Sequence, residues 1–164
     1  LVAAGAGVYI RGFVVQQLTA QQITTPEDAT MPNTPVDNMA SALSMANIIQ
    51  HHAAESGKGL TYAQMGRFAV ESGDPKGTNN ADEALKDAAG KPVANAARNT
   101  QLTAAGLVTS LSLSAMAIGA SYGAIALGIG FTVLGIVIAG LGYALLGLIT
   151  PEVAQRFGVH PVAA

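Results

Sequence analysis

The residues with the greatest potential for chemistry are three histidines, His51, His52 and His160. A non-haem iron site needs several histidine and carboxylate ligands held on one scaffold. His51 and His52 are adjacent, so on a helix their side chains point about 100° apart and do not easily bind one metal. We therefore interpret this pair as residues at a helix end that face water, and we expect no metal site.

The carboxylates are no more suggestive of catalysis. Those at 27–28, at 82–83 and at Asp87 are interpreted as solvated or helix-N-terminal charges rather than a catalytic pair. The glycines of residues 128–135, GIGFTVLG, have the wrong spacing for a dinucleotide loop and follow no strand. The sequence therefore predicts no catalytic or cofactor-binding residue and no enzyme, an expectation that a stoichiometric transition metal would contradict.

The composition is that of a membrane protein. The 164 residues are 50% hydrophobic and 11% charged, well below the roughly 25% charge of an ordinary soluble domain. The net charge is −2 and no basic run occurs, so nucleic acid is not expected as a partner. The absence of cysteine excludes disulfides and thiolate metal sites.

The last third of the chain carries the membrane signal. No Asp, Glu, Lys, Arg or His occurs between residues 102 and 149. Residues 124–149 are glycine-rich, and at about 1.5 Å per residue a helix of this length exceeds a hydrocarbon core of about 30 Å. We predict a glycine-rich transmembrane helix at 124–149 and a C-terminal tail at 150–164.

Residues 101–123 form either an amphipathic helix along the membrane surface or a second hydrophobic crossing with a break at 119–123. One helical stripe is apolar: Ala104, Leu107, Val108, Leu111, Ala115, Ile118 and Tyr122. A second stripe, roughly opposite, carries hydroxyls: Thr103, Ser110, Ser114 and Ser121. Hydroxyls need partners in lipid, although they can bond to their own helix, so they favour the surface helix.

Residues 1–18 are apolar apart from Arg11 and two glutamines. They are either the remainder of a signal peptide, with Ala4-Gly5-Ala6 as an A-x-A pattern, or part of an N-terminal transmembrane helix. We favour the transmembrane helix, because apolar residues continue beyond the pattern. Arg11 would then lie near its end and reach the headgroups.

Residues 19–100 are the one stretch able to form a water-exposed domain. Its nine acids and six bases give a local charge of −3, which favours an extracytoplasmic position under the positive-inside rule. The Pro-rich segment 21–36 is expected to be an extended linker. Such a small domain buries little apolar surface, so we expect it to pack on its own spans or on other subunits.

We expect this middle domain to be wholly helical. A helix should begin after Asp37 or Asn38 as N-cap and end at Gly57 and Gly59. Its expected apolar face is Met39, Leu43, Ala46, Ile49 and Ala53. Two shorter helices are predicted, from 61 to about 70 and from 80 to about 90.

Small residues recur every four positions through the apolar region. The series consists of Gly119, Gly123, Ala124, Gly128, Thr132, Gly135, Ala139, Gly140 and Ala144. Small side chains let helix backbones approach closely, which is how many membrane helices associate. We predict that this small-residue series is a helix-packing interface. A rotor ring or proton channel is disfavoured, because those need a carboxylate in mid-membrane.

Several short motifs resemble those of a known group of proteins. They are QQLTAQQIT, MANIIQHH, GKGLTYAQM and LVTSLSLSAMAIG. The chain is similar to small actinobacterial membrane proteins that are commonly labelled aromatic ring-opening dioxygenases. The resemblance implies a membrane-anchored protein with an external domain, in a context where such proteins accompany respiratory or envelope complexes. The three histidines do not support the chemistry of the label.

These observations predict a multi-pass protein of the plasma membrane. The first hypothesis is a non-catalytic accessory subunit of a larger respiratory or envelope complex, with membrane lipid and other subunits as partners. The alternative is a self-assembling scaffold that encloses lipid or quinone. An unrecognised enzyme is the third.

Overall fold

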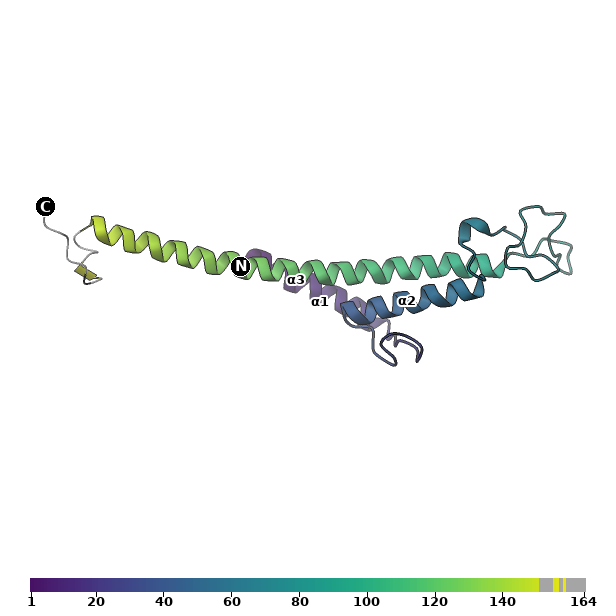
Figure 1. Ribbon diagram of the computed structural model, residues 1–164, viewed down its shortest axis with the longest axis horizontal. Coiled ribbons are helices and arrows are strands. Elements are labelled where there is room, and N and C mark those ends of the chain that lie inside the picture. Colours follow the sequence, from purple (N-terminus) through teal and green to yellow (C-terminus); the bar gives the residue numbers. More distant parts are fainter. Residues whose placement is uncertain (151–154, 157, 159–164) are drawn as a thin grey trace. The chain divides into compact units, whose positions relative to one another are not determined.

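The structure is a computed structural model that describes residues 1–150, 155, 156 and 158. Its α-helices are α1 (Val2–Ala20), α2 (Met39–Ser56) and α3 (Ala96–Ile149), and a short 3-10 helix, η1 (Tyr62–Gln64), follows α2 (Figure 1). The described residues contain no β-strand beyond isolated bridges. The prediction of an all-helical class is confirmed at this level.

Helix α3 contains both ranges that the sequence suggested as separate helices, 101–123 and 124–149. It remains helical through 119–123, where a break was considered. Among the described residues, α3 is the one helix long and apolar enough to cross a membrane, from Ala96 to Leu146. The chain divides into two compact units: the first holds residues 1–11 and the chain from Ala120 onward, and the second holds residues 12–119.

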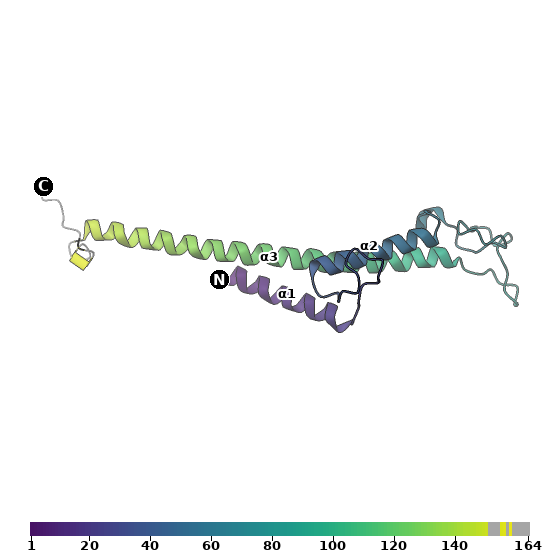
Figure 2. The same ribbon diagram turned by 60° about the horizontal axis from the view of Figure 1, so that its bottom comes forward.

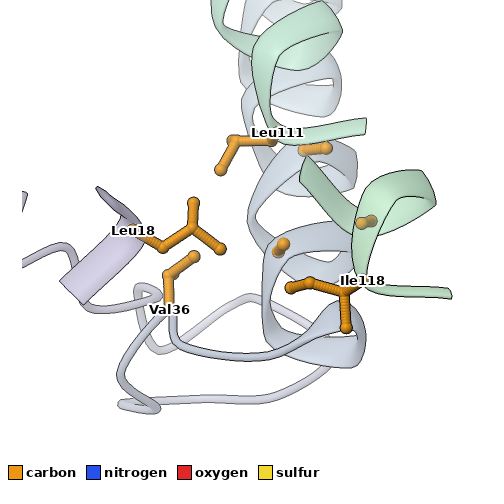
Figure 3. Close-up of a cluster of buried hydrophobic side chains, with 7 residues drawn as sticks. Leu18, Val36, Leu111 and Ile118 are labelled. Carbon is orange, nitrogen blue, oxygen red and sulfur yellow. The ribbon is translucent and has the colours of Figure 1, made fainter. Parts of the chain in front are cut away.

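The second unit has a small apolar core between α2 and the first part of α3, which lie side by side in both views (Figure 1 and Figure 2). Leu18 from α1 and Val36 from the following loop point toward each other, close to Leu111 and Ile118 of α3 (Figure 3). The core residues are Leu18, Val36, Ala42, Ala46, Leu111, Ala115 and Ile118. The predicted apolar stripe on α3 is thus confirmed at Ala104, Leu111, Ala115 and Ile118, whereas Leu107 and Tyr122 are exposed.

Helix α2 begins as predicted, and its expected apolar face is confirmed only in part. Asn38 is the N-cap, and its Oδ1 accepts hydrogen bonds from the backbone N–H groups of residues 40 and 41 at 2.9 and 3.0 Å. Met39 and Leu43 are each 40% exposed. Ala46 and Ala53 of the expected face are buried, and Ile49 packs against the core. The rest of the buried side is Ser41, Ala42, Ser44 and Ile48, mostly small residues that let α2 lie close to α3.

Residues 21–36 are not the extended linker that we predicted. The chain folds back on itself with a bridge between Thr24 and Pro35, and Thr25 is buried. The Thr25 hydroxyl donates to the Met31 carbonyl and accepts from the N–H of Thr34. The Thr25 hydroxyl thus supplies side-chain bonds that close the loop.

The two shorter helices predicted after Gly57 are also wrong, apart from the single turn of η1. From residue 65 to 95 the backbone pairs over long sequence separations, as in the reciprocal hydrogen bonds of 2.9 Å between Phe68 and Thr78. Side-chain carboxylates also accept hydrogen bonds from nearby backbone N–H groups, which are then not available to a helix. Asp87 Oδ1, for example, accepts from the N–H of Ala89 and of Lys91 at 2.9 and 2.8 Å. Such side-chain turns compete with helix formation.

Asn95 holds this irregular segment against the start of α3. It is buried, and its Nδ2 donates to the carbonyls of Gly66 and Pro75 at 3.1 and 2.8 Å. Gly77 lies beside it with φ +61°, and a Cβ there would lie 2.5 Å from Asn95 Nδ2. Glycine is required at this position by both the left-handed backbone and the lack of space.

Candidate functional site

In the first unit, α1 and α3 approach closely at two glycines. Gly7 is buried, and a Cβ placed there would lie 2.7 Å from the Ser121 carbonyl oxygen and 2.8 Å from Ile125 Cγ1. On α3, a Cβ at Gly128 would lie 2.5 Å from the backbone nitrogen of Ala4. Separations this short are not tolerated between real atoms, so the contact depends on the missing side chains.

The members of the small-residue series fall into three groups. Gly128 is buried against α1, and its neighbours Ala124 and Thr132 are half-buried. Thr132 satisfies its hydroxyl within the helix, by a bond of 2.7 Å to the Gly128 carbonyl. Gly119 belongs to the second unit, where its nearest neighbour is the Met39 sulfur. The remaining members are exposed in the described structure: Gly123, Gly135, Ala139, Gly140 and Ala144.

Reasoning from the sequence missed Gly7, the α1 side of this contact. In this part of the sequence, Ala4-Gly5-Ala6 also fits a cleavage pattern. A signal was available, because Ala3 and Gly7 are four residues apart and repeat the spacing of the series on α3.

From Leu127 onward the surface of α3 is apolar on most sides and largely uncovered among the described residues. Its large hydrophobic side chains are 46–68% exposed. They are Leu127, Ile129, Phe131, Val133, Leu134, Ile136, Val137, Ile138, Leu141, Tyr143, Leu145 and Leu146. A helix that is apolar all round is stable in lipid or when covered by other helices, and not in water.

The first unit also contains an isolated cation. Arg11 Nε donates a hydrogen bond of 3.1 Å to the Tyr122 hydroxyl, and the guanidinium carbon lies 5.5 Å from the centre of the Tyr122 ring. Both side chains are exposed.

The second unit has an open apolar groove of about 420 Å³ between the end of α1, α2 and α3. Its walls are Leu18, Ile23, Met45, Ile49, Leu107 and Leu111, and its polar rim is Gln17, Gln21, Ser110 and Ser114. The two serines do not need an outside partner, because they donate to the carbonyls four residues earlier at 2.9 and 3.0 Å. A second hollow of about 440 Å³ shares Ile49 and Leu107 and is lined at its other end by His52 and Thr103.

Each of the two described histidines pairs with a different carboxylate. His52 Nε2 lies 2.6 Å from Asp28 Oδ2, and His51 Nε2 lies 3.3 Å from Glu55 Oε1. The hydrogen bond from His52 lowers the pKa of Asp28 below its ordinary value of 3.8. No group of three or more potential metal ligands occurs among the described residues, and His160 lies outside them.

Comparisons with known proteins give no relative: no family model, no curated protein and no solved structure matches this chain.

Proposed function

We propose that the protein is a non-catalytic structural subunit that is anchored in the membrane by α3 and joins a larger complex. The observation that carries this proposal is the uncovered apolar surface of α3 between Leu127 and Leu146. Lipid covers part of such a surface, and neighbouring helices cover the part where small residues permit close contact.

The contact at Gly128 supports the view that one side of α3 packs against other helices while the rest faces lipid. Gly135 and Ala139 lie seven and eleven residues after Gly128, and therefore on nearly the same side of the helix. Apart from the adjacent backbone of α3, no described atom lies within 4 Å of a Cβ position at Gly135. The side of α3 that meets α1 at Gly128 thus continues as an open small-residue surface, which suits a helix of another subunit.

In the proposed topology the protein is multi-pass in the plasma membrane. Residues 1–11 pack against the apolar part of α3, which supports α1 as an accompanying span. The local charge of −3 in the middle domain supports an extracytoplasmic position. The partner would be a respiratory or envelope complex, by analogy with the actinobacterial proteins that the sequence resembles.

The alternative is a self-assembling scaffold that encloses lipid or quinone. The apolar groove of the second unit favours this alternative, because its walls suit an apolar tail and its rim is polar. Gentle solubilisation followed by measurement of the intact mass separates the two proposals. A stoichiometric complex with unrelated chains supports the subunit, whereas a single-species oligomer with bound lipid or quinone supports the scaffold.

Replacing Gly135 by leucine tests the open surface directly. Overpacking at a helix contact costs about 1–3 kcal/mol, so we expect association to weaken by about 5- to 150-fold, measured as the loss of the assembled species on dilution in detergent. Gly130 is the matched control, since it is equally open but lies on the opposite side of α3. Equal behaviour of Gly135→Leu and Gly130→Leu would show that the small residues are not an interface.

A further inference from the structure

Arg11 has an unusual setting for a charged residue. It is the only Asp, Glu, Lys, Arg or His in α1, and α3 contains none between residues 102 and 149. No described carboxylate lies within ion-pair distance of it; the described ion pairs involve the histidines alone. A cation on an apolar helix without a protein counter-ion is therefore free to pair with an anion from its surroundings.

The contact with Tyr122 gives the depth of Arg11. Tyr122 lies two residues before the apolar run 124–149, which is long enough to fill the hydrocarbon core of a bilayer. Tyrosine is enriched where the core meets the headgroups. Because Arg11 Nε bonds to the Tyr122 hydroxyl, the proposed membrane location places the guanidinium at the same boundary.

The same contact prepares the guanidinium for an anion. Tyr122 occupies Nε, and the described residues supply no other hydrogen-bond acceptor to Arg11. The terminal amino groups therefore remain available, and their planar geometry matches two oxygens of a phosphate.

We infer that Arg11 and Tyr122 form a binding site for the phosphate of an anionic phospholipid headgroup. This inference rests on the proposed membrane location. Arg11 would contact the phosphate, and Tyr122 would be a positioning residue that restrains the guanidinium. Anionic lipids are favoured over zwitterionic ones because the site carries a positive charge with no carboxylate beside it.

The test uses the full chain in mild detergent, titrated with phosphatidylglycerol or phosphatidylcholine, with lipid adducts counted by native mass spectrometry. We expect the wild type to prefer phosphatidylglycerol and Arg11→Gln to bind it about fivefold more weakly, with binding of phosphatidylcholine unchanged. Arg11→Lys keeps the charge but loses the paired geometry, and Tyr122→Phe loses the restraint on the guanidinium. The affinity of both variants for phosphatidylglycerol should therefore lie between those of the wild type and Arg11→Gln. Lys91→Gln makes the same charge change on an exposed loop and should have no effect.

Three results would overturn the inference. If Arg11→Gln keeps its fold by circular dichroism and still binds phosphatidylglycerol as the wild type does, the proposed site is refuted while the membrane proposal stands. If inorganic phosphate binds as tightly as the lipid by ³¹P NMR, the site is not specific for a lipid headgroup. Failure of the wild type to float with vesicles of either lipid removes the membrane proposal as well.

Discussion

The pair of His52 and Asp28 connects two segments whose contact was not predicted from the sequence. Asp28 lies in the loop before α2, and His52 lies in the last turns of α2, where the sequence predicted a water-facing residue. His52 does remain half exposed, but it also ties the loop 21–36 to the helix. Because the folded-state pKa of Asp28 is lowered, the bond stabilises the protein above pH 3.8 and is lost as the pH falls through the lowered pKa.

We therefore predict that His52→Ala raises the pKa of Asp28 toward 3.8, since the hydrogen bond from His52 is the main cause of its shift. The carboxyl carbon of Asp28 can be followed by NMR during a pH titration. His51→Ala is the control, because His51 is the smallest of the contributions to the same shift. An unchanged titration in His52→Ala would refute the assignment.

Among the helices, the contact of α1 with α3 depends on the absence of side chains. Gly128 faces backbone rather than a flexible side chain, so a substituent there cannot be accommodated by a rotamer change. The sequence predicted the α3 half of this contact from the four-residue spacing. The same pattern does not say which members of the series meet a partner, because spacing along one helix contains no information on where a second helix lies.

We predict that Gly128→Leu separates the two helices, at a cost of about 1–3 kcal/mol or more. The nuclear Overhauser contact between the Gly7 α-protons and the Ile125 Cγ1 protons reports the approach of the helices, because Gly7 and Ile125 touch about one helical turn from the contact at Gly128. Gly130→Leu should retain that contact, since open space surrounds Gly130. Retention of the contact in Gly128→Leu would argue against close packing at this glycine.

For the chain as a whole, the proposed topology places the domain between α1 and α3 outside the cell and the residues after α3 inside. The protein has no cysteine, so one introduced thiol reports a single position. Ala88 in the middle domain and Gln155 after α3 are both exposed.

We predict that an impermeant maleimide labels Ala88→Cys in intact cells, and labels Gln155→Cys only after the membrane is opened. The physical reason is that the apolar part of α3, which would span the bilayer, lies between the two positions. The same side for both thiols would contradict a single crossing by α3, and the reverse pattern would invert the proposed orientation.

The helical class, the ends of α2 and the apolar stretch of α3 could all be predicted from the sequence. Each depends on residues that are close along the chain: Asn38 caps the turn that follows it, Gly57 ends the helix before it, and the absence of charge from 102 to 149 is a property of one continuous segment. The apolar stripe at Leu111, Ala115 and Ile118 was predictable for the same reason.

Contacts between distant residues decided the rest. Residues 61–70 and 80–90 have local signals for helix starts, yet the pairing of Phe68 with Thr78 and the bonds of Asn95 hold the segment in another conformation. The close packing of Gly7 and the hydrogen bond of Arg11 likewise involve α3 residues more than 100 positions away. Local propensities differ by about 1 kcal/mol or less per residue, so a few hydrogen bonds and close contacts made across the fold are enough to override them.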